Sequence, residues 1–304
     1  MVFSDTYLQP NAEDPVLPEE AVVEAARRHA PEVGRLLEVD ESGGEARAYL
    51  LDGGIVMKTQ RPHRLRPRTS LRKEALFLAE LERQGHFPVP RALGHGEIDG
   101  IEYLCLTRLD GVAIEHASVD AGARIAFLNE LGRTLRSIHE IEQSDLAGSG
   151  LVPGDDTPAD VTVRLADAFD RLAAALEADG PFAGIDVGAI AAHCLERTPS
   201  STPPVALHSN PGPEHSFVDP STGTFVGLID FGDAYRSHPA LDLRPWTEAA
   251  DAEAVLAGYR SAGPLPDDFE DVWRAGLVIV ELARASRGGR SPDELSVSLD
   301  RLVG

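Results

Sequence analysis

The sequence contains almost no lysine. Of its 28 basic side chains only Lys58 and Lys73 are lysines, so each is worth attention as a functional group. The two cysteines, Cys105 and Cys194, have no metal-type spacing, which predicts two reduced, buried thiols in a cytoplasmic protein. The longest strongly apolar stretch, residues 275–280, is too short to span a bilayer, and no secretory signal is expected at the N-terminus.

Positive charge is also scarce, since 50 acidic side chains face 28 basic ones and the net charge is -22. This balance would repel nucleic acid and anionic membranes, so we expect neither as a partner. It would attract a cationic small molecule. The acidic residues are nevertheless scattered along the chain, and a diffuse charge that favours solubility is the simpler interpretation. No pattern in the sequence indicates an oligomeric state.

The length of 304 residues suits two packed lobes, and a hydrophobic share of 42% is ordinary for a folded protein. Glycine-rich turns separate short runs of apolar residues in the first part, which predicts β-hairpins. The expected order is a helix over 17–30, strands over 33–39, 46–51 and 55–59, a helix over 70–84, and strands over 91–97 and 101–107.

After residue 110 the pattern changes to apolar residues at helical spacing, interrupted by a strand-rich island over 205–229. A helix is expected over 269–285. These patterns predict an α+β fold with an N-terminal lobe over residues 1–108 and a helical lobe over 109–304.

The island carries the polar residues that suit metal and phosphate chemistry. Two short strands, 216–218 and 225–229, flank a Pro-Ser-Thr-Gly turn; His215 stands at the entry and Asp230 follows the second strand. A hairpin of this length would bring the imidazole and the carboxylate together. Such a pair predicts a site for a divalent ion that bridges nucleotide phosphates.

This region resembles the aminoglycoside phosphotransferase and choline kinase family of kinase-like small-molecule phosphotransferases. The family pattern is His-Gly-Asp, four residues and Asn, then Ile-Asp-Phe-Gly-Asp; here the chain reads HSNPGPEH (208–215) and IDFGD (229–233). Downstream, SHPALDL resembles the family motif whose last aspartate, Asp242 here, supports the catalytic loop. The resemblance implies a two-lobed protein-kinase-like fold with a small β-rich N-lobe and a larger, mostly helical C-lobe.

Upstream motifs extend the resemblance over most of the chain. By analogy with the family, Gly43 and Gly44 would cover the nucleotide phosphates, Lys58 would contact them, and Glu74 would pair with Lys58. The segment CLTRLDG (105–111) resembles the hinge that receives the nucleotide base, which places Thr107 and Leu109 in the nucleotide site. The resemblance of these segments implies that ATP or GTP is the phosphoryl donor.

The resemblance also implies roles in the second lobe. Asp230 and His215 would hold Mg²⁺, although histidine replaces the usual asparagine and oxygen ligands suit this ion better. His208, grouped with the catalytic residues, would orient the loop through hydrogen bonds. Taken alone, a lysine on a strand or a glutamate on a helix is an ordinary surface charge. The functional interpretation of Lys58 and Glu74 therefore depends on the order of all these motifs along the chain.

Asn210 stands where the family has the catalytic aspartate. An amide oxygen is too weakly basic to take the proton of the acceptor hydroxyl. Three explanations remain open: the chain uses another base, with Asp233 or Glu214 the nearest candidates, or an already nucleophilic acceptor; the chain is a nucleotide-binding pseudokinase; or the asparagine is an engineered change. The neighbouring Ser209 and Pro211 also depart from the family, which argues against a single engineered change.

The sequence therefore favours an enzyme that moves the γ-phosphoryl group of ATP or GTP to a hydroxyl of a small molecule. An aminoglycoside-like antibiotic fits the acidic balance, and choline-like, sugar and macrolide acceptors remain open. A catalytically impaired binding module is the alternative. A protein kinase is not expected, because no Ala-Pro-Glu segment follows Asp230-Phe231-Gly232.

Overall fold

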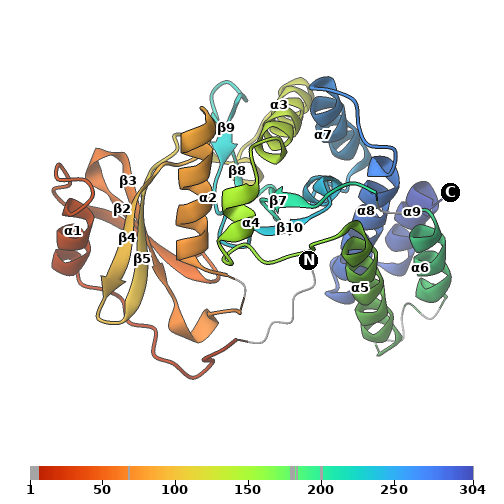
Figure 1. Ribbon diagram of the computed structural model, residues 1–304, viewed down its shortest axis with the longest axis horizontal. Helices are drawn as coiled ribbons and strands as arrows, with labels where there is room; N and C mark the ends of the chain where they lie inside the picture. The colour runs from red at the N-terminus through yellow and green to blue at the C-terminus, as the bar shows by residue number, and fades with distance from the viewer. Residues whose placement is uncertain (1–6, 68, 179–181, 183, 199–200, 304) are drawn as a thin grey trace.

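The computed structural model describes residues 7–67, 69–178, 182, 184–198 and 201–303 of the chain. They form two lobes joined side by side, with a β-sheet lobe built from the first third of the sequence and a helical lobe from the rest (Figure 1). The predicted α+β, two-lobed kinase-like architecture is therefore confirmed.

A single antiparallel sheet forms the N-terminal lobe, with strand order β1-β2-β3-β5-β4. Every strand and helix predicted here is present, with ends that differ by at most three residues. The elements are α1 (Glu19–Arg27), β1 (Leu36–Asp40), β2 (Ala46–Leu51), β3 (Ile55–Gln60), α2 (Leu71–Gln84), β4 (Ala92–Ile98) and β5 (Ile101–Thr107).

The two faces of this sheet have different partners. Side chains alternate along β3, so Ile55 and Met57 are buried on one face with the apolar residues of α1. Lys58, one position further, points to the opposite face, where α2 lies. Leu104 and Leu106 of β5 join that second face to the core of the helical lobe.

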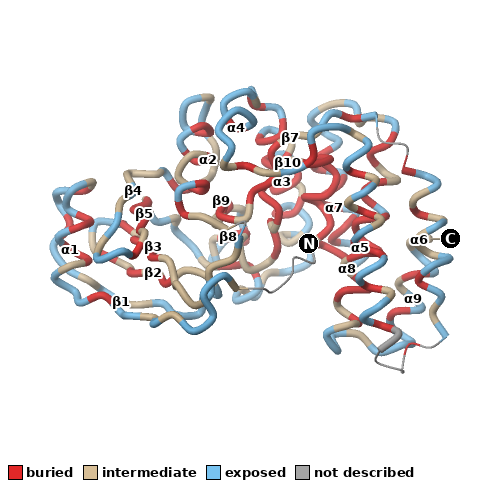
Figure 2. Tube along the Cα trace, turned by 60° about the horizontal axis from the view of Figure 1, so that its bottom comes forward, coloured by how far each residue is buried: buried red, intermediate tan, exposed pale blue. Residues whose placement is uncertain are grey.

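The helical lobe contains two small sheets, β6-β8-β9 and β10-β7, surrounded by helices. Its elements are β6 (Val112–Ala113), α3 (Ala121–His139), α4 (Ser144–Gly148), α5 (Pro158–Ala178), α6 (Val187–Glu196), β7 (Val205–Leu207), β8 (Ser216–Val218), β9 (Phe225–Leu228), β10 (Tyr235–Ser237), α7 (Ala249–Ser261), α8 (Phe269–Ser286) and α9 (Pro292–Val303). Figure 2 shows buried stretches on α3, α7 and α8 and exposed segments on the outer turns. None of the helices in the described ranges has the length and apolar character needed to cross a membrane.

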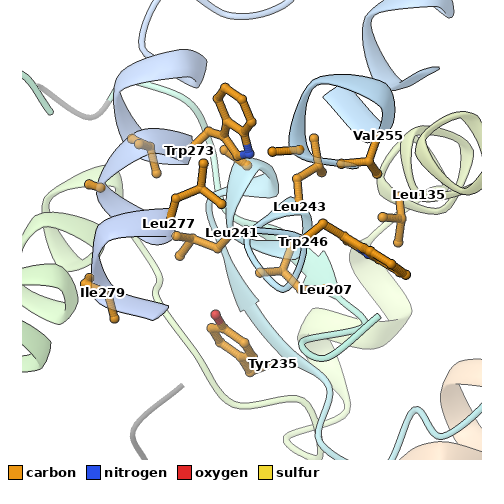
Figure 3. Packing of buried hydrophobic residues seen from close by; sticks show 14 of the residues in the cluster. Leu135, Leu207, Tyr235, Leu241, Leu243, Trp246, Val255, Trp273, Leu277 and Ile279 are labelled. Atoms are coloured by element: carbon orange, nitrogen blue, oxygen red, sulfur yellow. The ribbon is translucent and has the colours of Figure 1, made fainter. Parts of the chain in front are cut away.

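A short 3₁₀ segment, Pro239–Leu243, lies at the centre of this lobe. Its Leu241 and Leu243 pack against Leu277 and Trp273 of α8 (Figure 3). The apolar contacts fix the position of Asp242, which lies between the two leucines in the sequence. The same apolar cluster reaches Leu104 and Leu106 in the first lobe, so the proposed lobe boundary between residues 108 and 109 crosses a shared core.

Both cysteines are free and buried, as the sequence predicts. Burial raises the pKa of the Cys105 thiol to about 12 and that of Cys194 to about 11. Both thiols are therefore protonated and unreactive at neutral pH.

Helices α3 and α7 approach each other closely because each presents a glycine at the contact. A Cβ atom on Gly132 would lie 2.1 Å from the Val255 carbonyl oxygen, and one on Gly258 would lie 2.0 Å from the Asn129 carbonyl oxygen. Neither neighbour is a flexible side chain that could move aside. The backbones therefore pack directly against each other.

We expect Gly258→Ala to lower the melting temperature by about 2–5 °C, because overpacking typically costs between about 1 and 3 kcal/mol. Gly148→Ala is the control, since a Cβ there meets no atom within 4 Å. Thermal unfolding followed by circular dichroism measures both. Equal melting temperatures for the two variants would contradict the close helix contact.

Candidate active site

A cleft of about 1050 Å³ is lined by residues of both lobes. Its volume is at the upper end of the range for small-molecule sites. Most of the residues predicted to act in the site line this cleft: Gly43, Gly44, Lys58, Glu74, Thr107, Leu109, Asn210, Glu214, His215, Asp230 and Asp233.

Lys58 connects the two lobes at the centre of the cleft. Its Nζ atom lies 2.6 Å from Glu74 Oε2 on α2 and 2.7 Å from Asp230 Oδ1 at the end of β9. Glu74 is buried and the Lys58 side chain is 15% exposed, whereas the Asp230 side chain is 40% exposed toward the cleft. One ammonium thus bridges two carboxylates that are 156 positions apart in the sequence (230 − 74).

Neighbouring charges determine the ionisation states of Lys58 and Asp230. Burial alone would lower the pKa of Lys58, but the carboxylates of Asp230 and Glu74 outweigh it and raise the pKa above the ordinary value. Burial would raise the pKa of Asp230, but Lys58 and then His215 lower it below the ordinary value. At neutral pH Lys58 is positive and Asp230 is negative.

Helix α2 is held against the segment after Asp230 by three contacts. The Ser70 amide donates to the Gly232 carbonyl oxygen at 3.4 Å, and Lys73 Nζ donates to the Ala234 carbonyl oxygen at 2.8 Å. The rings of Phe77 and Phe231 lie 5.0 Å apart. These contacts fix the face of α2 that carries Glu74.

Asp242 supports the loop that precedes β8. Its Oδ2 and Oδ1 accept from the His208 and Ser209 amides at 2.8 and 2.7 Å. Oδ2 also lies 2.9 Å from His139 Nε2, and the other nitrogen of that ring contacts Tyr259 Oη at 2.9 Å. Burial would raise the pKa of Asp242, but these hydrogen bonds and the nearby histidines lower it. The buried carboxylate of Asp242 thus holds the backbone of this loop in place through hydrogen bonds to its amides.

His208 is the one predicted catalytic residue that does not line the cleft. Its side chain is fully buried beneath the loop, with Nε2 2.9 Å from the Ile229 carbonyl oxygen. Burial lowers the pKa of this imidazole to about 4, so the ring is neutral at physiological pH. This position matches the expectation that His208 orients the loop and leaves it no contact with a substrate.

Ser209 has a φ of 84°, in the left-handed region that glycine adopts without strain. The family pattern has glycine at this place. Serine at this φ costs of the order of 1–2 kcal/mol. The loop therefore keeps the backbone conformation that a glycine would allow, although its sequence has changed.

Asn210 lies in the cleft with its amide oriented by a neighbour. Its Nδ2 donates to Glu214 Oε1 at 2.9 Å, which leaves the amide oxygen, Oδ1, as an acceptor. The backbone carbonyl oxygen of Asn210 lies 2.9 Å from His215 Nδ1. Because a carbonyl oxygen only accepts, Nδ1 carries a proton.

The tautomer of His215 bears on metal binding. Its second nitrogen, Nε2, lies 3.3 Å from Asp230 Oδ2. No hydrogen bond joins these two atoms in the described part of the chain, so both could bind a common divalent ion. Ligands at adjacent corners of an octahedron, each about 2.1 Å from a metal, lie about 3 Å apart. The geometry fits a divalent ion.

These two side chains alone do not form a complete metal site. Within the described ranges, no group of three or more His, Cys, Asp or Glu side chains is arranged to hold an ion. Magnesium in nucleotide sites usually takes one or two protein ligands and fills the remaining positions with phosphate oxygens and water. The pair therefore fits an ion that arrives with a nucleotide.

The remaining predicted residues occupy the edges of the cleft. Gly43 lies between β1 and β2, where a Cβ atom would be 2.5 Å from the Ala46 carbonyl oxygen. Thr107 and Leu109 lie at the connection between the lobes. Asp233 accepts from Thr69 Oγ1 at 2.5 Å. The catalytic, nucleotide and metal roles given to these residues stay predictions.

Sequence reasoning missed a group of arginines on the C-lobe wall: Arg244, Arg284 and Arg287 line the cleft with Ile279, Val280 and Ala283. Arg244 directly follows the SHPALDL segment, and this position in the sequence could have indicated that it lies near the cleft. The other two lie on α8 or just after it, where nothing in a helical pattern indicates which turn faces a cleft.

Known structures have the same architecture. An aminoglycoside 2'-phosphotransferase-IIIa bound to GDP is 18% identical, with a TM-score of 0.61 over 94% of this chain and 97% of that one. The macrolide 2'-phosphotransferase MphH from Brachybacterium faecium is 19% identical, with a TM-score of 0.60 over 93% and 98% of the two chains. The streptomycin-ATP-APH(2'')-IIa ternary complex is 15% identical, with a TM-score of 0.60 over 89% and 90%. At these identities the likeness shows the fold.

Family membership comes from the sequence itself. No curated protein sequence matches the chain. The profile of the phosphotransferase enzyme family, APH, matches residues 37–278, which is most of the chain and includes both lobes. The chain therefore belongs to the phosphotransferase enzyme family and has the kinase-like fold of the aminoglycoside and macrolide phosphotransferases.

Proposed function

We propose that this protein transfers the γ-phosphoryl group of ATP or GTP to a hydroxyl group of a small molecule. The observation that carries the proposal is the bridge from Lys58 to Glu74 and Asp230 in a cleft between two lobes. Phosphoryl transfer depends chiefly on positioning and charge neutralisation, which this arrangement supplies. Location in the cytoplasm, expected from the two free thiols, stays a prediction.

Each residue has a place in the proposed reaction. Lys58, fixed by Glu74, contacts the phosphates, and the hinge near Leu109 receives the base. Asp230 and His215 would hold Mg²⁺, which would neutralise phosphate charge when bound. The amide oxygen of Asn210 accepts a hydrogen bond from the acceptor hydroxyl and orients it toward the γ-phosphorus.

The proton of that hydroxyl needs an acceptor other than Asn210. Glu214 is the nearest candidate, because one of its oxygens is already hydrogen-bonded to the Asn210 amide at 2.9 Å. In the proposed step the hydroxyl oxygen bonds to the γ-phosphorus, its proton passes to Glu214, and the nucleoside diphosphate leaves. Asp233 is the alternative, but its carboxylate is engaged by Thr69.

A nucleotide-binding pseudokinase is the second candidate, and Asn210 is the observation that favours it. Two measurements separate the candidates. A rise in melting temperature with Mg²⁺-ATP or Mg²⁺-GTP tests nucleotide binding. Transfer of labelled phosphate to a panel of hydroxyl compounds tests turnover. If neither the unmodified chain nor Asn210→Asp catalyses any transfer, the enzyme proposal is wrong.

We expect Lys58→Met to lower the transfer rate by about 10²–10³-fold, because a preorganised charge at the phosphates is lost. The same change leaves the carboxylates of Glu74 and Asp230 without their shared cation. Gln60→Ala is the control, since Gln60 lies on the same strand and lines the same cleft. Initial rates at saturating nucleotide measure both, and similar rates would remove Lys58 from the mechanism.

We expect Asn210→Asp to raise the transfer rate, by up to about 10²–10⁴-fold, because it restores a general base. The new carboxylate would lie next to that of Glu214, and two such groups within hydrogen-bond distance share a proton. The rate of the single variant should therefore rise with pH, since the base is free only above the raised pKa of the pair.

Glu214→Gln separates the two candidate bases. In the unmodified chain it should lower the rate, whereas in the Asn210→Asp background it should preserve the rate and shift the pH profile to lower pH. Rate against pH for the four proteins gives the answer. An unchanged rate for Glu214→Gln alone would show that Glu214 is not the base.

A further inference from the structure

The C-lobe wall of the cleft carries positive charge that the nucleotide chemistry does not use. This wall consists of Arg244 and Pro245, after the 3₁₀ segment, and of Arg284 and Arg287 near the end of α8. We call it the arginine wall. It adjoins the catalytic loop, because Trp246 Nε1 donates to the Pro211 carbonyl oxygen at 2.9 Å.

Arg244 is the central observation. Arg244 is only 6% exposed, and its Nη1 donates a hydrogen bond to the Tyr235 hydroxyl at 3.3 Å. Nη2 is buried and has no hydrogen-bond partner in the described ranges of the chain. Among the residues that the structure describes, no carboxylate forms an ion pair with Arg244. A buried guanidinium without a counter-ion is costly, which calls for an anion from outside the chain.

The other two arginines differ in how their charge is balanced. Arg284 lies 3.1 Å from Glu281, which also pairs with Arg290, so its charge is largely neutralised. Arg287 is exposed, and the described part of the chain contains no ion pair or hydrogen bond of its side chain. Arg244 and Arg287 are therefore the two cations available to a ligand on this wall.

Most carboxylates that line the cleft already accept from a donor within the protein, and among the described residues none of them pairs with Arg244 or Arg287. The donors are Lys58 for Glu74 and Asp230, Asn210 for Glu214, Thr69 for Asp233, Arg66 for Glu45 and the Ser42 amide for Asp40, whereas Glu115 is 43% exposed and lies 3.5 Å from His116. These acidic side chains belong to other elements around the cleft, whereas on the arginine wall an oxyanion would meet Arg244 and Arg287, which have no carboxylate partner among the described residues.

We propose that the acceptor carries an oxyanion, a carboxylate or a phosphate, in addition to the hydroxyl that is phosphorylated, and that Arg244 and Arg287 bind this group. The planar guanidinium matches either oxyanion in a bidentate manner. This inference rests on the proposed function and specifies its substrate class. It reverses the expectation from the net charge of -22, because scattered surface charges are screened beyond about 8–10 Å.

The test uses matched acceptors that differ in one group. Hydroxy acids are paired with their primary amides, sugar phosphates with the free sugars, and both sets are compared with aminoglycosides. With Mg²⁺-ATP or Mg²⁺-GTP, kcat/KM should favour the anionic member by about 10–100-fold. A preference for hydroxy acids over their amides would indicate a carboxylate acceptor, and a preference for sugar phosphates over free sugars would indicate a phosphate acceptor.

Arg244→Gln and Arg287→Gln should remove this preference, mainly by raising KM, and leave the melting-temperature shift with nucleotide unchanged. Arg287 is exposed, so its variant keeps the test valid if the buried Arg244→Gln does not fold. Arg260→Gln is the control, since Arg260 is exposed, pairs with Glu270 and lies off this cleft. It should retain the preference.

The outcomes distinguish the two proposals. Transfer to neutral or cationic hydroxyl compounds at equal or better efficiency would overturn the oxyanion inference and leave the proposed function standing. If nothing is phosphorylated, even by Asn210→Asp, the proposed function fails, and binding of the same compounds then decides. A melting-temperature rise with the acids, absent with the amides and lost in Arg287→Gln, would still support the oxyanion site. Equal shifts for acids and amides would overturn it.

Discussion

The ion pair of Lys58 with two carboxylates is the interaction on which the site depends. Glu74 belongs to helix α2 of the first lobe, and Asp230 follows strand β9 of the second, so the bridge exists only when both lobes take their observed places. An ammonium largely withdrawn from water requires such compensation, because an unpaired buried charge is expensive. This one contact therefore fixes both the Lys58 ammonium and the positions of the elements that carry the two carboxylates.

Asp242 is the corresponding constraint on the loop that precedes β8. One buried carboxylate accepts from two consecutive loop amides and from His139, and the leucines on either side of it are packed against α8. The loop conformation is set from outside the loop. This arrangement explains how Ser209 is held at a positive φ where glycine would be relaxed.

Much of the first lobe could be predicted because its signals are local. The alternation of apolar residues along β3 places Met57 in the core and Lys58 on the opposite face, and this follows from strand geometry alone. The meeting of Lys58 and Asp230 could be anticipated only through the family resemblance, since the two are 172 positions apart. The burial of His208 under the loop could not be read from its spacing.

The arginine wall shows where sequence reasoning fails. Total charge predicts a long-range field, whereas recognition depends on the few groups that face a ligand and on which of them are already paired. Arg284 and Arg287 are three positions apart and look equivalent in the sequence. Glu281 neutralises the first, and the second has no such partner among the described residues. Only the tertiary contacts make this distinction.

The attachment of α2 to the segment after Asp230 has a consequence for control. In protein kinases the corresponding helix moves in and out, and this movement switches the lysine–glutamate pair on and off. Here hydrogen bonds from Ser70 and Lys73 and the tilted ring contact of Phe77 with Phe231 hold the helix in its inward position. If the chain acts as the proposed phosphotransferase, its lysine–glutamate pair would be assembled by these contacts without a covalent switch.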